Sequence, residues 1–194
     1  MTVLRETVVK ALAELNVQGN EEGLIPAFGV LVNQLPTTFW NLFAERMTEA
    51  ATDEASRAKV EDALVNCAYE CGYHTGYGII NSEEFRAVVM PMVTEGAKDV
   101  LRGAYAVFTA WGWAKSGIVQ LREKERMVVR AVDYYEADSG GSGLRAYMIR
   151  GVSAAFFELA FAAPYPDGMN TYKCEQVSGI EVGDAFGEFV VEPK

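Results

Sequence analysis

The side chains best suited to chemistry lie in the segment NCAYECGYHTGYG, residues 66–78. It holds two of the three cysteines of the chain and its only histidine, as Cys67, Cys71 and His74. Spacings of four and three residues put all three on one face if the segment is helical. Thiolate and imidazole are preferred ligands of Zn²⁺, and Cys174 could complete a tetrahedral set. Three interpretations are open: a metal site, the wall of a ligand cavity, or packing in a core.

Two considerations weigh against the metal site. Cysteine ligands of structural zinc usually lie about two to four residues apart on turns, whereas Cys67 and Cys71 are a full helical turn apart. Cysteine is also among the residues most often buried for packing alone. We therefore expect a pocket wall or packing and no cofactor, with zinc on Cys67, Cys71, His74 and Cys174 as the alternative.

Glycines and aromatic residues accumulate in the same segment. Gly72, Gly76 and Gly78 each cost a helix about 1 kcal/mol relative to alanine, which predicts either a close approach of another helix or room for a ligand. Rings with a polar end suit the wall of an apolar cavity, which should exceed about 300 Å³. We expect the ligand-binding wall to consist of six residues: Tyr73, His74, Tyr77, Trp111, Trp113 and Tyr135.

Catalytic motifs give no support for an enzyme. The sequence has no G-x-S-x-G, no phosphate-binding loop with lysine, and no G-x-G-x-x-G after a strand. Cys71 and His74 could touch across one helical turn, but Glu70 points to another face and cannot orient the histidine. We expect no catalytic residue. An enzyme subunit of the reductase or hydrolase type and a dimeric assembly protein are the alternative functions.

Composition restricts the partners and the compartment. The 194 residues carry 27 acidic and 17 basic side chains, a net charge of −10, which argues against nucleic acids and anionic membrane surfaces. No stretch approaches the roughly 20 apolar residues of a membrane span. Charges recur throughout the N-terminal segment MTVLRETVVKALAEL, which is unlike a secretory signal, and the cysteine count is odd. These features predict a cytoplasmic protein with reduced thiols.

Helical periodicity occurs in most of the first 111 residues. The pattern predicts a helix over 2–17, a second that begins at Thr37, and a third over about 54–79 with Asp53 as its N-cap. A fourth helical pattern extends from Ser82 to about Trp111. It contains Pro91, which predicts a kink or a break because proline cannot continue the hydrogen-bond ladder.

Alternating patterns follow. Residues 117–123 and 126–137 predict two strands joined by a tight turn near Lys124, and the tail predicts two more around a Gly-Asp turn. Between the hairpins, the run SGGSG at 139–143 predicts a flexible loop and residues 144–161 a strongly apolar helix. We therefore expect an α+β fold, with N-terminal helices packed on an antiparallel sheet built from two hairpins with an intervening helix.

From about residue 60 to 192 the chain resembles the 4-vinyl reductase-like, hydrocarbon-binding domain family. The resemblance rests on Gly72-Tyr73-x-x-Gly76, on AWGWAKSGIVQL, on VRAVDYYEAD, and on MIRGVSAAFFELAF followed by GIEVGDAFGEFVV. Relatives in this family include the ligand-sensing domains of aromatic-responsive transcription activators and transport-particle subunits of the Golgi. The resemblance implies a ligand-binding domain over 56–194, preceded by an N-terminal helical extension over 1–55.

The sequence departs from this family at two sites. Many members bind zinc through the pattern C-x-x-x-G-D-x-x-C, but Gly179 and Gly187 occupy both cysteine positions here, so the resemblance implies that this zinc site is lost. His74 does not fall on the phenol-binding histidine of the aromatic sensors, whose position lies nearer Gly78 or Ile79. The resemblance thus supports the fold and a ligand cavity more than zinc or phenol.

These observations favour a small-molecule-binding domain for an apolar or aromatic ligand, acting as a sensor or carrier. No nucleic acid and no membrane is expected as a partner. The apolar helix over 144–163 and its small-residue face suggest a homodimer interface.

Overall fold

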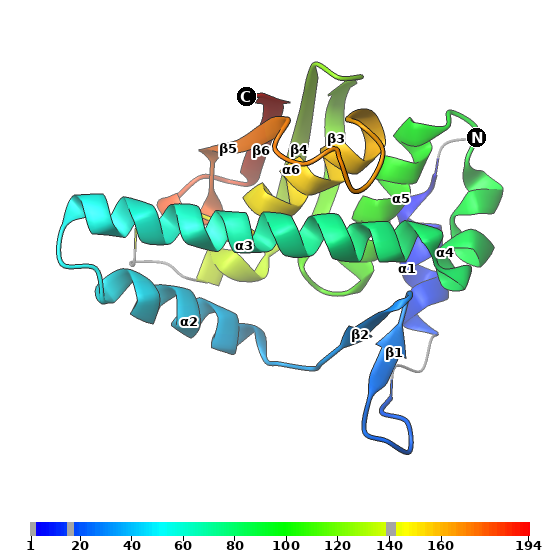
Figure 1. Cartoon of the computed structure of the whole chain (residues 1–194), viewed down its shortest axis with the longest axis horizontal. Coiled ribbons are helices and arrows are strands. Elements are labelled where there is room, and N and C mark those ends of the chain that lie inside the picture. Colours follow the sequence, from blue (N-terminus) through cyan, green and yellow to red (C-terminus); the bar gives the residue numbers. More distant parts are fainter. Residues whose placement is uncertain (1–2, 15–17, 139–142) are drawn as a thin grey trace.

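The computed structural model describes residues 3–14, 18–138 and 143–194. These residues form an α+β fold, as predicted from the sequence, with the helices packed on an antiparallel sheet (Figure 1). The helices are α1 Arg5–Ala13, α2 Thr37–Glu49, α3 Glu54–Asn81, α4 Glu83–Val88, α5 Ala97–Ala110 and α6 Tyr147–Phe161. The strands are β1 Ile25–Ala27, β2 Val30–Val32, β3 Ala114–Arg122, β4 Arg126–Tyr134, β5 Tyr172–Ser178 and β6 Gly187–Pro193. The loop predicted at 139–143 falls mostly outside the described residues.

The main sheet has the order β3-β4-β6-β5, and every neighbouring pair in it is antiparallel. Both predicted hairpins are confirmed. Lys124 with φ 62° and Gly183 with φ 99° supply the left-handed backbone in the two connections. Alternate residues of β4 and β6 face α6 and are fully buried, which makes this side of the sheet the floor of the core: Met127, Val129, Ala131, Phe189 and Val191. Strands β1 and β2 form a separate hairpin that projects from the body.

Helix α3 begins at its predicted N-cap. The Asp53 carboxylate accepts a hydrogen bond from the Ser56 amide at 2.7 Å, and the Ser56 hydroxyl accepts one from the Asp53 amide at 3.1 Å. This reciprocal capping box satisfies two amide groups at the helix end. The helix then continues for 28 residues across the whole molecule (Figure 1), so it carries the segment 66–78 along one face of α6.

The break predicted near Pro91 is confirmed. Helix α4 ends at Val88, a short 3-10 turn η1 follows over Met90–Met92, and α5 begins only at Ala97. The buried Asp99 carboxylate holds the connection by accepting hydrogen bonds from the amides of Thr94 and Glu95, each at 2.9 Å. Helices α4 and α5 therefore replace the single helix predicted over 82–111, and each can cover a different part of the core.

Helix α6 lies between α3 and the sheet, and most of its residues are buried. A Cβ atom added at Gly151 would lie 2.5 Å from the Val65 carbonyl oxygen and 2.6 Å from the Tyr69 amide nitrogen of α3. The small-residue face of α6 is thus covered by α3 of the same chain. The prediction that this face forms a dimer interface is wrong, because the sequence pattern does not distinguish a partner helix in the chain from one outside it.

The N-terminal helix α1 packs on α5 and shares a cluster of buried side chains with it, among them Val8, Leu12 and Val107. Within the described parts of the chain, no helix is both long and apolar enough to span a membrane.

Candidate ligand pocket

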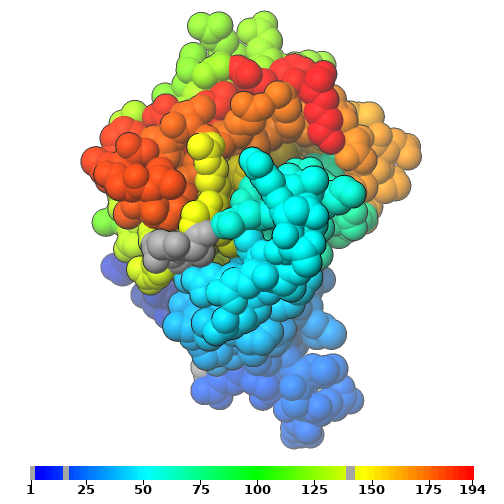
Figure 2. Space-filling view, turned by 90° about the vertical axis from the view of Figure 1, so that its left-hand side faces the viewer, coloured from blue at the N-terminus to red at the C-terminus, as the bar shows by residue number. Residues whose placement is uncertain are grey.

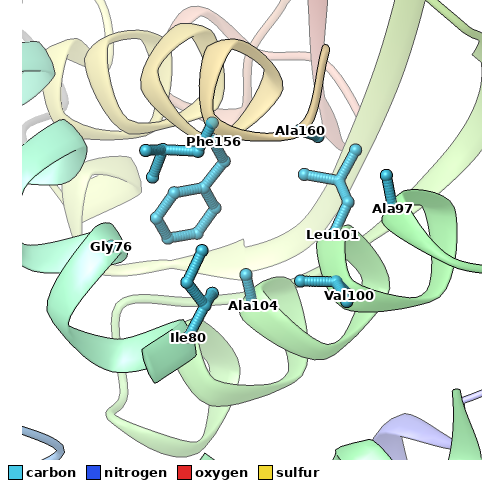
Figure 3. Close-up of a pocket in the computed structure, with 9 residues that line it drawn as sticks. Gly76, Ile80, Ala97, Val100, Leu101, Ala104, Phe156 and Ala160 are labelled. Carbon is cyan, nitrogen blue, oxygen red and sulfur yellow. The ribbon is translucent and has the colours of Figure 1, made fainter. Parts of the chain in front are cut away.

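An apolar pocket of about 210 Å³ lies where α3, α5 and α6 meet (Figure 3). Its volume is below the roughly 300 Å³ expected from the sequence as the lower end for ligand sites. An apolar cavity of about 150 Å³ in another protein nevertheless binds benzene, so the space suffices for one ring. The lining comes from three helices: Gly76 and Ile80 of α3, Ala97, Val100, Leu101 and Ala104 of α5, and Phe156, Leu159 and Ala160 of α6.

Small residues create this space. A Cβ atom added at Gly76 would lie 2.9 Å from Leu159 Cδ1 and 3.0 Å from Phe156 Cε1, so glycine lets these α6 side chains reach over α3 in their present positions. Ala104 on α5 and Ala160 on α6 end at the Cβ atom and leave the centre empty, while the Phe156 ring and Leu101 close the sides (Figure 3). The sequence predicts either a close approach of another helix or room for a ligand at the glycines of α3. Gly76 fits both, because it contacts side chains of α6 and also borders the pocket.

Three predicted ligand-binding residues gather elsewhere on α3. Tyr73, His74 and Tyr77 surround Tyr165, which lies in the connection between α6 and β5. The rings of Tyr77 and Tyr165 stack with centroids 3.9 Å apart, and His74 Nδ1 lies 3.0 Å from the Tyr165 hydroxyl. Tyr73 is fully buried, and its hydroxyl accepts a hydrogen bond from the Gly168 amide at 3.2 Å. This cluster fastens the connection to α3, and none of its members lines the apolar pocket.

Of the other three predicted residues, Trp111 and Trp113 follow α5 and Tyr135 follows β4. Trp111 packs edge-on against Phe28, with ring centroids 5.3 Å apart. Trp113 and Tyr135 border a second, open groove of about 810 Å³ between α1 and the ends of β3 and β4, where charged side chains such as Lys10 also lie. The six residues thus occupy three separate places, and a role for them in ligand binding stays a prediction.

The residues of the alternative zinc site are not assembled. Cys67 and Cys71 are exposed on α3, whereas Cys174 lies on the inner side of β5, where burial raises the pKa of its thiol to about 12. In the parts of the chain that the structure describes, no group of three or more His, Cys, Asp or Glu side chains could hold a metal ion. At the Gly-Asp turn, the Asp184 carboxylate accepts a hydrogen bond from the Gly179 amide at 2.9 Å.

Two buried carboxylates hold the helices that border the pocket. Glu136 accepts hydrogen bonds from the amides of Met148 and Ile149 in the first turn of α6, at 2.8 and 3.2 Å. Burial nonetheless raises the pKa of Glu136 to about 7, because desolvation outweighs these bonds. The pKa of Asp99 is lowered to about 2. Its burial alone would raise the pKa, but hydrogen bonds from the amides of Thr94 and Glu95 and from the Arg102 guanidinium outweigh this effect.

The pocket-lining residues other than Gly76 were not among those predicted from the sequence. They are alanine, valine, leucine, isoleucine and phenylalanine, the types that fill any hydrophobic core. The apolar periodicity of α5 and α6 identifies them as inward-facing. No sequence signal separates a residue that touches an empty space from one that touches a neighbour, since this depends on how three helices meet.

Comparison with known proteins shows a similarity at the level of the fold. No protein-family model and no curated protein sequence matches the chain. Among solved structures, the chain is similar to the phenol-responsive sensory domain of the transcription activator PoxR in complex with phenol, with a TM-score of 0.66 and 10% sequence identity. The match covers 100% of this chain and 92% of that domain, so it includes residues 1–55, which the sequence resemblance does not reach. The chain therefore shares the fold of that domain.

Proposed function

We propose that this protein is a small-molecule-binding domain for an apolar or aromatic ligand, acting as a sensor or carrier. The observation that carries the proposal is the apolar pocket at the junction of α3, α5 and α6, in a fold whose solved relative responds to phenol. The 4-vinyl reductase-like resemblance of residues 60–192 leads to the same class of function. Burial of one ring in this pocket supplies the binding energy, at about 25 cal/mol per Å² of apolar surface.

The pocket is positioned to transmit ligand binding. Its three walls belong to helices that meet the rest of the core in different ways, since α6 packs on the sheet and α5 contacts both α1 and β3. A ring between Ala104 and Phe156 would hold α3, α5 and α6 together. In a sensor, the helices would then be fixed relative to one another only when the ligand is bound.

The test uses a substitution that fills the pocket. Ala104→Leu places three additional carbon atoms into the space, whereas Ala63→Leu makes the same change on an exposed part of α3. Binding of monocyclic aromatic compounds, measured by ligand-detected NMR in sealed tubes, should be lost in Ala104→Leu and kept in Ala63→Leu. If the wild-type protein binds no member of a panel containing toluene, phenol and cyclohexane at millimolar concentration, the proposed function is wrong.

We also propose that the protein forms a homodimer, through α2 rather than α6. The residues of α2 that are buried are only Ala44 and Thr48. A stripe on the same helix remains exposed, with exposed fractions between 43% and 51%, and it consists of Phe39, Leu42, Phe43 and Met47. Helix α2 and the hairpin β1–β2 stand out from the body in Figure 2.

The size of this stripe supports an interface. A whole aromatic side chain presents about 150–250 Å², so four large side chains near half exposure present roughly 350 Å². Patches of this extent on monomeric proteins are often functional. A standard interface buries about 800 Å² per partner, and the apolar centre would be this stripe.

A further inference from the structure

The side chains around the apolar pocket contain no polar atom. Each of the nine described residues that line the pocket is a glycine or carries a hydrocarbon side chain. The close-up in Figure 3 shows the Phe156 ring and the ends of Ile80, Val100 and Leu101 around the empty space. A ligand in the pocket would contact aliphatic side chains of all three helices and the Phe156 ring of α6.

Two buried polar side chains next in sequence to this lining, Tyr105 and Asp99, are already engaged. Tyr105 follows Ala104 on α5, but its hydroxyl is bonded to the Ser153 hydroxyl of α6 at 2.8 Å, and both residues are buried. Asp99 lies between lining residues of α5, and it accepts its hydrogen bonds from Thr94, Glu95 and Arg102. Neither group lines the pocket. A ligand hydroxyl group directed at the lining would therefore displace a stable hydrogen bond or leave its own unmade.

An unmade hydrogen bond is costly for a ligand. Burial of a hydroxyl without a partner weakens binding by roughly 5- to 150-fold, from mutational data on proteins. A methyl group in the same place strengthens binding about fourfold. Among ligands of the same shape, a pocket lined by hydrocarbon side chains therefore binds the more hydrophobic ligand more tightly.

We infer that the pocket takes a hydrocarbon of one ring, aromatic or alicyclic and without polar substituents, and discriminates against phenols. This inference rests on the proposed function, because it specifies the ligand of the same pocket. The volume of about 210 Å³ limits the ligand to a single ring with small alkyl substituents. Recognition is by shape and hydrophobicity, without a hydrogen bond to the ligand.

The experiment compares toluene with phenol, which differ by a methyl group in place of a hydroxyl. Dissociation constants for the full chain are measured in sealed cells, for toluene directly and for phenol by competition. Toluene should bind at least about fivefold more tightly. Ala104→Ser adds a hydroxyl to the wall and should reduce this ratio, whereas Ala63→Ser on the exposed face of α3 should leave it unchanged.

The outcomes separate the inference from the function on which it rests. Phenol that binds as tightly as toluene, with both lost in Ala104→Leu, overturns the hydrocarbon preference and leaves the ligand-binding function standing. Failure of toluene, phenol and cyclohexane to bind, or binding that Ala104→Leu does not change, overturns both the inference and the proposed function. The wild-type ratio decides the matter even if the Ala104→Ser variant does not fold.

Discussion

The contact between α3 and α6 predicts a large effect for one added methyl group, in the variant Gly151→Ala. Its Cβ atom would lie 2.5 Å from the Val65 carbonyl oxygen, 2.6 Å from the Tyr69 amide nitrogen and 2.7 Å from Ala68 Cβ. Ordinary contacts begin at 3.4 Å, so the two helices must separate by almost 1 Å. Two of these three atoms are backbone atoms and cannot turn aside. Overpacking of this kind costs about 3 kcal/mol, and the higher helix propensity of alanine returns about 1 kcal/mol.

We therefore expect Gly151→Ala to lower the free energy of unfolding by about 2 kcal/mol, which for a chain of this size lowers the melting temperature by roughly 4–8 °C. Urea and thermal unfolding followed by circular dichroism measure both quantities. Gly117→Ala is the matched control, because the nearest atom to its Cβ would be Arg5 Nη1 at 3.9 Å. A Gly151→Ala variant within about 0.5 kcal/mol of the wild type would refute the close approach on which the position of α6 depends.

Three further predictions concern charge and association. The pKa of Glu136 is raised in the folded protein from 4.5 to about 7, so its contribution to the free energy of unfolding is complete below pH 4.5 and is lost as pH rises through 7. The loss amounts to at most about 3 kcal/mol. Glu136→Gln should therefore make the free energy of urea unfolding less dependent on pH between 5 and 8. The pKa of Asp99 is lowered to about 2 from 3.8, so Asp99→Asn should cost about 2 kcal/mol at pH 6, and the difference should shrink as pH falls from 4 towards 2. A pH-independent difference would contradict this assignment. Phe43→Glu should convert the proposed dimer to a monomer in light scattering, whereas Thr38→Glu, at an exposed position of the same helix, should not. A wild-type protein that is monomeric at micromolar concentration would contradict the proposed α2 interface.

The sequence by itself determined the fold class and most of the elements, but not the hairpin β1–β2. Periodicity and the Asp53 cap located α3, Pro91 predicted the gap between α4 and α5, and the turns at Lys124 and Gly183 located both hairpins. These signals are local, because a cap, a proline or a left-handed turn residue acts on the backbone within a few positions of itself. The family resemblance is consistent with the structural match to a phenol-responsive sensory domain.

The tertiary structure decided where empty space and exposed surface lie. The sequence predicts that aromatic residues with polar ends bind the ligand, and this role stays a prediction. In the structure Tyr73 and Trp111 pack against neighbouring rings, and the apolar pocket is bordered by ordinary core residues such as Leu101 and Phe156. The apolar face of α6 is covered within the chain, while that of α2 is not. A pattern of side chains shows that a face is apolar. Which partner covers the face, and whether a gap remains there, depends on how helices distant in the sequence pack together.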